Sequence, residues 1–179
     1  MTRIQPLDPG KVQGKTQELL AAIKAKMGRV PNVFKTMAHS PMVLQAYLGF
    51  SGAFVDAKLP PKVREQIALA VGEDNQCGYC VAAHSAIGKL SGLTPEEIEA
   101  GRRAKSQDPK TDAILKFTKK LSSNRGNITD PELAEVRRAG CSDEEILEII
   151  TAVVLNLFTN YVNHVADTAI DFPQASPLG

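Results

Sequence analysis

The sequence predicts an all-α protein, and three local patterns lead to that prediction. No segment alternates apolar and polar residues with a period of two for long enough to indicate a β-sheet. The pairs Thr94 with Glu97 and Ser142 with Glu145 have the spacing of helix capping boxes. Proline follows a capping residue, as in the first turn of a helix, after Asp8, Ser40, Thr94, Asp108 and Asp130.

These signals place the predicted helices. Glycines at positions 28, 92, 126 and 140 indicate breaks between them. We expect a loop or single turn over 28–34 and an irregular tail from Phe172 onward. The expected helices span 9–27, 41–56, 60–74, 77–90, 94–105, 108–124, 130–139 and 142–168.

The last predicted helix is apolar on most of its sides. Ile149, Val153 and Leu157 follow helical spacing, and Phe158 widens the apolar surface. Such a helix must be covered on most sides, so we expect it to run through the centre of the domain and to face another subunit. Three asparagines and His164 interrupt it, so we expect it to fall short of the ~20 apolar residues of a membrane-spanning helix.

Composition and charge are those of a soluble globular protein. Hydrophobic residues make up 43% of the chain, and the formal net charge of +1 indicates neither nucleic acid nor an anionic membrane as a partner. The N-terminal residues include no apolar stretch, so we expect no signal peptide and a cytoplasmic location. We predict a single domain over 1–179, with an N-terminal arm (about 1–58), a core (about 59–105) and C-terminal helices (about 106–170).

The informative motif is a C-x-x-C pair followed by a histidine. Cys77, Cys80 and His84 stand at i, i+3 and i+7, so a helix that begins near Cys77 places them on one face. The β-carbons of cysteines three residues apart lie about 5–6 Å apart, near enough for a disulfide with modest adjustment. Glu65, on the preceding predicted helix, could reach back to orient His84. The third cysteine, Cys141, stands alone, and we expect it to be inert packing.

These residue types together predict thiol redox chemistry. An ordinary thiol, with a pKa of about 8.5, is only a few per cent thiolate at neutral pH, and helix N-terminal amides or a basic neighbour favour the anion. We predict that the Cys80 thiolate attacks a hydroperoxide, that His84 with Glu65 protonates the departing alkoxide, and that Cys77 then forms the disulfide. Spacing to His84 favours Cys80 as the attacking residue and the helix dipole favours Cys77, so the sequence leaves both open.

The same residues carry a resemblance to a known family. The motif resembles the signature of AhpD-like members of the carboxymuconolactone decarboxylase family. In this chain it consists of Glu65, then eleven residues, the C-x-x-C pair, three residues and His84. Segments 28–34, 39–41, 59–60, 160–165 and 171–173 also agree, and the last two are similar to its peroxidase-related subgroup. The resemblance implies an AhpD-like helical fold with the C-x-x-C pair at the N-terminal end of a core helix, and assembly into homotrimers or homohexamers.

The activity that the resemblance implies is that of a peroxiredoxin-type alkyl hydroperoxide reductase, an antioxidant peroxidase with Cys80 peroxidatic and Cys77 resolving. Its partners would be a small-molecule hydroperoxide and an external dithiol reductant, such as a lipoyl-bearing or thioredoxin-like protein. No cofactor or metal is implied, nor a nucleic acid or membrane partner. The well-studied branch has a histidine where this chain has Tyr79, which is therefore a weaker catalytic candidate. A phenol is a poor base at neutral pH, so the relay would be shorter and the peroxidase activity weak or differently directed. The decarboxylase branch lacks the cysteine pair, so we do not expect lactone decarboxylation.

Three other interpretations of the motif stay open. Two cysteines, His84 and Glu65 could bind zinc. The pair could also serve a redox sensor or disulfide-exchange protein with little peroxidase turnover, or be purely structural. His164 either belongs to a buried, hydrogen-bonded polar cluster or lines the site near Cys80, and we expect His39 to be a loop or capping residue.

Overall fold

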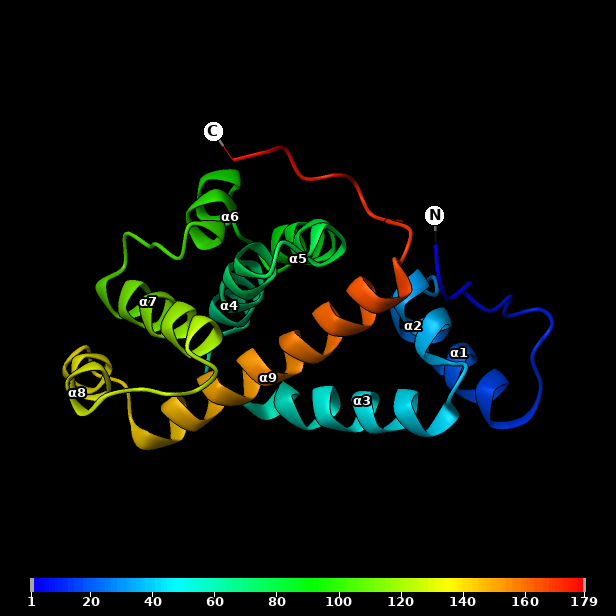
Figure 1. Ribbon diagram of the computed structural model, residues 1–179, viewed down its shortest axis with the longest axis horizontal. Helices are drawn as coiled ribbons and strands as arrows, with labels where there is room; N and C mark the ends of the chain where they lie inside the picture. The colour runs from blue at the N-terminus through cyan, green and yellow to red at the C-terminus, as the bar shows by residue number, and fades with distance from the viewer. Residues whose placement is uncertain (1, 179) are drawn as a thin grey trace. The chain divides into compact units, whose positions relative to one another are not determined.

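The computed structural model describes residues 2–178, and the regular structure in that part of the chain is helical throughout. The all-α prediction is therefore confirmed. The helices, labelled in Figure 1, are α1 (Gly14–Met27), α2 (Asn32–Met37), α3 (Pro41–Ala53), the 3₁₀ helix η1 (Phe54–Asp56), α4 (Pro61–Asp74), α5 (Gly78–Leu90), α6 (Pro95–Arg102), α7 (Pro109–Ser123), α8 (Asp130–Arg138) and α9 (Asp143–Ala166).

The described chain divides into two compact units. The first unit contains the chain up to Asp56 together with Tyr161–Asp171, and the second contains Ala57–Asn160 together with the chain from Phe172 onward. In the first unit, α3 packs against α1 and α2. In the second unit, α4 packs against α5, α6 and α7, and α8 packs against α7 (Figure 1). The motif singled out in the sequence lies entirely in the second unit.

Helix α4 forms the centre of the second unit. Every residue from Gln66 to Gly72 is buried, so this stretch of the helix is covered on all sides. An apolar cluster of Leu69, Leu93 and Ile98 joins α4 to α6 and to the turn before it. Burying each such side chain stabilises the fold by about 1.5–3 kcal/mol. The central position of α4 makes it a rigid support for the residues that follow it in the chain.

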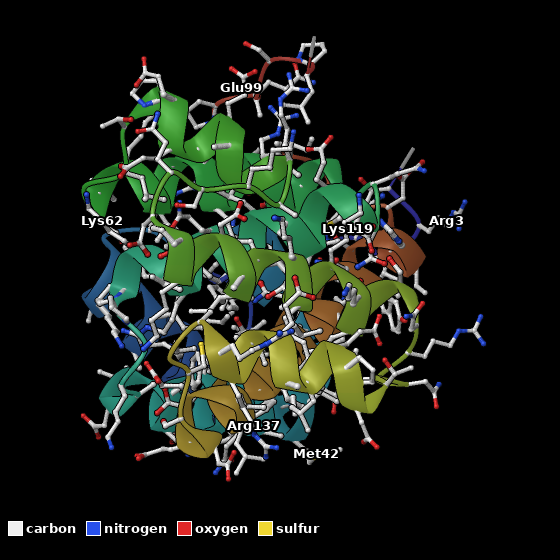
Figure 2. All side chains as sticks on the ribbon, turned by 90° about the vertical axis from the view of Figure 1, so that its left-hand side faces the viewer. Arg3, Met42, Lys62, Glu99, Lys119 and Arg137 are labelled. Atoms are coloured by element: carbon white, nitrogen blue, oxygen red, sulfur yellow. A yellow bond between two sulfur atoms is a disulfide. The ribbon has the colours of Figure 1, made fainter. Side chains whose placement is uncertain are left out.

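Charged side chains cover the outer faces of the second unit's helices. Lys62 on α4, Glu99 on α6 and Arg137 on α8 project from the ribbon in Figure 2 and are exposed. The Arg137 guanidinium pairs with the Asp143 carboxylate at 2.9 Å. Exposed pairs of this kind contribute about 1 kcal/mol at most. The stability of the unit therefore rests on its apolar interior.

Most predicted helix starts are confirmed by side-chain hydrogen bonds to the first turn. The Val43 amide donates to Ser40 Oγ at 3.4 Å, and the Thr111 amide donates to Asp108 Oδ2 at 2.8 Å. Each of these bonds satisfies a backbone donor that has no partner within the helix. Both predicted capping boxes have their two reciprocal bonds: Thr94 with Glu97, and Ser142 with Glu145.

One predicted start and one predicted cap are wrong. The first helix begins at Gly14 and not at Pro9, because the Asp8 carboxylate accepts the Gly10 amide at 2.9 Å and closes a tight turn instead of capping a helix. Helix α8 begins at residue 130 as predicted, but its cap is Thr129 and not Asp130, since Thr129 forms a capping box with the residue three positions on.

The segment expected to be a loop or single turn contains the start of a helix. Helix α2 begins at Asn32, whose amide donates to the Asp171 carboxylate at 3.0 Å. The same carboxylate accepts from Arg29 at 3.1 Å. The group that caps α2 thus comes from a residue 139 positions away in the sequence, which no local pattern indicates.

Helix α9 was expected to be too polar to span a membrane. By length and composition alone it is in fact long and apolar enough to do so. The core helix of a soluble protein passes the same test, and α9 carries buried amides at Asn156 and Asn160. A buried amide is costly in hydrocarbon unless it is hydrogen-bonded, and both of these amides are.

Candidate functional site

The site begins at the tight turn that joins α4 to α5. The Cys77 amide donates to the Gly72 carbonyl at 2.8 Å and the Gln76 amide to the Glu73 carbonyl at 2.9 Å, the two bonds of a Schellman helix ending. Gln76 holds φ at 55°, a left-handed conformation that glycine adopts more easily. The turn places Cys77 directly at the N-cap of α5, as the sequence predicted.

Cys77 and Cys80 form a disulfide. Their α-carbons are 5.3 Å apart, a usual separation for disulfide-bonded cysteines, and both residues are buried. Cys77 Sγ also accepts the Cys80 backbone N–H at 3.4 Å, so this sulfur is the N-cap acceptor of α5. A β-carbon added at Gly72 would meet the β-carbon of Cys80 at 3.4 Å. The glycine therefore lets α5 approach α4 closely at the second cysteine.

Glu65 and His84 meet across α4 and α5, as predicted. Glu65 Oε2 lies 2.8 Å from His84 Nδ1, and the two side chains are only 18% and 22% exposed. An ionised carboxylate can only accept, so Nδ1 carries the hydrogen and Nε2 is the nitrogen left for chemistry. The contact is therefore present, whereas proton transfer between His84 and Cys80 stays a prediction.

A chain of two side-chain amides, Asn75 half-buried and Asn160 buried, reaches the second cysteine. Asn160 Nδ2 donates to Cys80 Sγ at 3.1 Å, and Asn75 Nδ2 donates to Asn160 Oδ1 at 3.0 Å. Asn160 is completely buried. Neither asparagine was among the predicted site residues. The available signal was the presence of amides on an otherwise apolar helix, which does not indicate the partners of these amides.

Tyr79 lies between the cysteines in sequence and is buried. Its ring packs edge-on against Phe172, with centroids 5.7 Å apart. The segment that follows Phe172 is held in turn by Arg102, which donates to the Ser176 carbonyl at 2.7 Å and to the Glu73 carboxylate at 2.8 Å. An edge-on aromatic pair stabilises packing. These contacts give Tyr79 a packing role, and they leave its suggested catalytic role a prediction.

The remaining histidines belong to the first unit. His164 is exposed, so the expectation that it joins a buried polar cluster is wrong: on α9, its neighbours Asn160 and Asn163 are buried while His164 faces outward. Its role near Cys80 stays a prediction. His39 lies within hydrogen-bonding distance of the Gln5 carbonyl, at 2.9 Å from Nε2, which fits the loop role expected for it.

The zinc interpretation lacks a suitable ligand cluster. Within residues 2–178, no group of three or more histidine, cysteine, aspartate or glutamate side chains lies close enough together to hold a metal ion. Cys141 is a free, buried thiol. Burial raises the pKa of the Cys141 thiol, and the nearby Lys110 ammonium only partly opposes this. A raised thiol pKa means little thiolate at neutral pH, which agrees with the inert role predicted for this cysteine.

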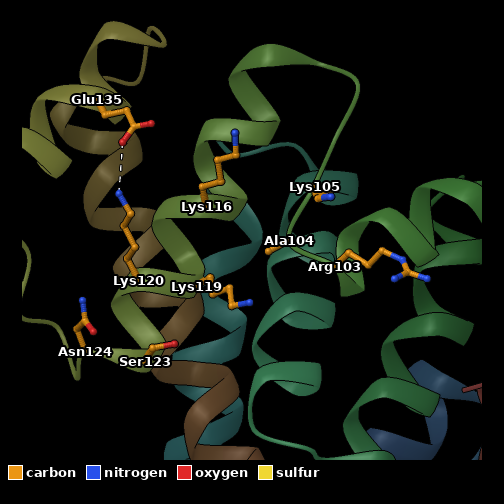
Figure 3. A pocket seen from close by; sticks show the side chains of 9 residues that line it. All are labelled: Arg103, Ala104, Lys105, Lys116, Lys119, Lys120, Ser123, Asn124 and Glu135. Atoms are coloured by element: carbon orange, nitrogen blue, oxygen red, sulfur yellow. Dashed lines mark hydrogen bonds and ion pairs between the residues drawn. The ribbon is translucent and has the colours of Figure 1, made fainter. Parts of the chain in front are cut away.

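A separate hollow of about 420 Å³ lies between α7, the start of the turn after α6, and α8 (Figure 3). Three of its five cationic side chains pair with carboxylates: Arg103 with Glu99 at 2.9 Å, Lys116 with Asp112 at 2.7 Å, and Lys120 with Glu135 at 3.3 Å. These pairs therefore offset only part of the positive charge of the hollow. It is lined by Arg103, Ala104, Lys105, Lys116, Lys119, Lys120, Ser123, Asn124 and Glu135.

Comparison with known proteins agrees with this fold and motif. Residues 41–120, which contain the cysteine pair, match the sequence profile of the carboxymuconolactone decarboxylase family. A search of the curated proteins finds no similar sequence.

Solved structures of similar architecture cover nearly the whole chain. An uncharacterized peroxidase-related protein from Ralstonia eutropha JMP134, described as an alkylhydroperoxidase AhpD core, is 24% identical over 95% of this chain and 92% of its own, with a TM-score of 0.85. A peroxidase-related protein from Silicibacter sp. TM1040 is 26% identical over 93% and 91% of the two chains, with a TM-score of 0.80. The debrominase Bmp8 is 21% identical over 96% and 93%, with a TM-score of 0.81, and a variant of it has been crystallised with 2,3,4-tribromopyrrole. These similarities confirm the AhpD-like fold.

Proposed function

We propose that this chain, whose residues 41–120 match the carboxymuconolactone decarboxylase family and whose fold is AhpD-like, is a thiol-dependent peroxidase that reduces organic hydroperoxides. The observation that carries the proposal is the Cys77–Cys80 pair at the start of α5, with the Glu65–His84 pair one helix turn further along. The similarity to a peroxidase-related protein at 26% identity supports the same reaction class.

The reaction that we propose has three steps. The Cys80 thiolate attacks the terminal oxygen of the hydroperoxide, so that an S–O bond forms, the O–O bond breaks, and an alkoxide leaves. The Cys80 thiol first passes its proton to His84 Nε2, and the resulting imidazolium donates that proton to the departing alkoxide, with Glu65 holding the ring. The Cys77 thiol then attacks the Cys80 sulfenic acid, forming the disulfide and releasing water. An external dithiol reduces the disulfide and becomes a disulfide itself, which closes a two-electron cycle.

The alternative within the same chemistry is a redox sensor. A sensor needs the same pair of cysteines, and both disulfide sulfurs are buried. The two functions differ in turnover, because a peroxidase must be reduced again rapidly by a dithiol. We propose that the partner in this step is an external dithiol, such as a lipoyl-bearing or thioredoxin-like protein.

The proposal is tested by mixing reduced, metal-free protein with one equivalent of cumene hydroperoxide and following free thiols and intact mass. We expect the loss of two thiols and of the mass of two hydrogen atoms, and we expect Cys80→Ser to abolish both. Cys141→Ser is the matched control, since it removes a buried cysteine outside the pair and should change neither.

Three outcomes would contradict the proposal. Thiols that persist for hours with the hydroperoxide would exclude a peroxidase. Since one structural neighbour is a debrominase crystallised with 2,3,4-tribromopyrrole, the same assay is run with that compound. Consumption of the bromopyrrole without reaction of the hydroperoxide would assign the dithiol to dehalogenation instead. Rapid oxidation followed by negligible multiple turnover with dithiothreitol would favour the sensor.

We also propose that the protein forms a homo-oligomer through α9. The proposal is supported by an exposed apolar stripe on the part of this helix in the second unit: Leu147, Ile150, Val154 and Phe158 are each more than a third exposed. Their spacing of three, four and four residues puts them on one face, the pattern by which two helices interlock. A second copy of the chain offers the same stripe, so the stripe is self-complementary.

A further inference from the structure

The buried amide of Asn160 is aimed at the sulfur of Cys80. Asn160 Nδ2 lies 3.1 Å from Cys80 Sγ, and neither residue has appreciable solvent exposure. A buried side-chain amide is costly unless its donors and acceptor are satisfied. A neutral disulfide sulfur is a weak acceptor, whereas a thiolate is a strong one. The amide is thus better matched to the reduced, ionised form of Cys80 than to the disulfide in which it is seen.

The direction of this hydrogen bond is fixed by a second asparagine. The Asn75 amide nitrogen donates both to the Val71 carbonyl at 3.0 Å and to Asn160 Oδ1 at 3.0 Å. An amide nitrogen has two hydrogens, so both donors of Asn75 are used, and its own oxygen cannot turn toward Asn160 without breaking them. Because Asn160 Oδ1 accepts from Asn75, the nitrogen of Asn160 must face the sulfur. The main chain of α4 therefore orients the donor at Cys80.

We propose that Asn160 is a catalytic residue of the dithiol site, whose N–H stabilises the negative charge on Cys80 Sγ, and that Asn75 positions it. The inference rests on the proposed function and deepens it. Burial of Cys80 removes water from the sulfur, and an unsolvated anion needs a protein donor in its place. Asn160 supplies that donor without releasing a proton of its own.

The two sulfurs therefore differ in how their charge is stabilised. Cys77 Sγ accepts the backbone N–H of Cys80 at 3.4 Å, whereas Cys80 Sγ accepts the side chain of Asn160. When the thiolate of an external dithiol attacks Cys77, a new S–S bond forms there, the Cys77–Cys80 bond breaks, and its electron pair leaves on Cys80. Asn160 stabilises that leaving thiolate. The geometry thus assigns Cys77 as the sulfur that the reductant attacks, and Cys80 as the thiolate that then meets the hydroperoxide.

The test compares three alanine variants, each made in a Cys77→Ser background so that Cys80 is the only site-pair thiol. Asn160→Ala removes the donor and Asn75→Ala removes its support. Asn156→Ala is the matched control: Asn156 is buried one turn earlier on α9, and its amide donates only within its own helix, to the Ala152 carbonyl at 2.8 Å. Alkylation of Cys80 by iodoacetamide is followed by mass spectrometry across the pH range, together with the melting temperature.

We expect the midpoint of the Cys80 alkylation profile to move upward in Asn160→Ala by about one to two pH units, the effect of losing a hydrogen bond to a charged group. Asn75→Ala should shift the midpoint in the same direction but by less. If Asn160→Ala does not fold, the Asn75→Ala variant tests the inference in its place. Asn156→Ala should lower the melting temperature without moving the midpoint. In the chain with both cysteines, dithiothreitol should reduce the Asn160→Ala disulfide more slowly than the Asn156→Ala disulfide.

An unchanged midpoint in Asn160→Ala, or equal shifts in the Asn160 and Asn156 variants, would overturn the inference. No peroxide is present in the alkylation assay, so its result does not depend on peroxidase activity. A protein that oxidises with hydroperoxide but shows no Asn160 shift would keep the proposed function and lose this assignment. A protein that shows the shift but does not react with hydroperoxide would keep the assignment of Asn160 and lose the proposed peroxidase function.

Discussion

Replacing Glu65 by glutamine tests the proton relay most directly. The change keeps the shape of the side chain and removes the negative charge 2.8 Å from His84 Nδ1. Charge-assisted hydrogen bonds contribute about 1.5–3 kcal/mol and are roughly twice as strong as neutral ones, so the change weakens the contact by about 0.8–1.5 kcal/mol. Both side chains are mostly buried, so solvent screens this loss only partly. If His84 acts in the transition state, the oxidation rate should fall by about 4- to 12-fold.

The assay is the second-order rate of thiol loss when the reduced protein meets cumene hydroperoxide in a stopped-flow instrument. The chain offers a matched control in Glu73→Gln, because Glu73 is also on α4 and its carboxylate pairs with Arg102 at the same 2.8 Å distance. The two variants therefore lose similar ion pairs, and only one of these pairs involves His84. Rates within two-fold of each other would refute a role for the Glu65–His84 pair.

Three further predictions follow from other parts of the second unit. Gln76→Gly should stabilise the protein by about 0.5–1 kcal/mol, measured by urea unfolding, since Gln76 is exposed and holds φ at 55°. The Lys110 ammonium, with the Ser142 amide, holds the pKa of Glu145 below its usual range. These contacts therefore add to the free energy of unfolding at pH values above the pKa of Glu145 in the unfolded chain, and this stabilisation is lost as the pH falls through its pKa in the folded protein. The melting temperature of Glu145→Gln should accordingly fall less between pH 5 and pH 3 than that of the wild type. Val154→Asp should dissociate the proposed oligomer in light scattering, and a wild type that is already monomeric would contradict the α9 interface.

The parts of the fold that the sequence predicted are those set by contacts within four residues. The cap at Ser40 and the capping box of Thr94 with Glu97 are complete within one turn, so their residue types reveal them. Helix α2 was missed for the opposite reason. Its first amide is held by Asp171, and a hydrogen bond that spans 139 residues leaves no local pattern.

The same contrast between contacts near in sequence and contacts distant in sequence separates the site residues that were predicted from those that were not. Cys77 and Cys80 lie one turn apart, and Glu65 and His84 lie on consecutive helices, so spacing alone brought each pair together. The bond to Cys80 from Asn160 spans 80 residues. The sequence showed that an amide interrupts an apolar helix, which indicates that it must find a partner. It could not show which partner, because that depends on how α9 lies against α4 and α5.

The site also separates two tasks that a single residue could have performed. An amide N–H does not release its proton near neutral pH, so Asn160 can hold charge on Cys80 but cannot protonate an alkoxide. An imidazole can transfer a proton, and the Glu65 contact fixes which of its nitrogens is left to do so. A histidine hydrogen-bonded to the thiolate would lose its proton-donating role to that contact, whereas an amide leaves the histidine available. In the proposed mechanism, this division of tasks accounts for a buried amide beside the second cysteine.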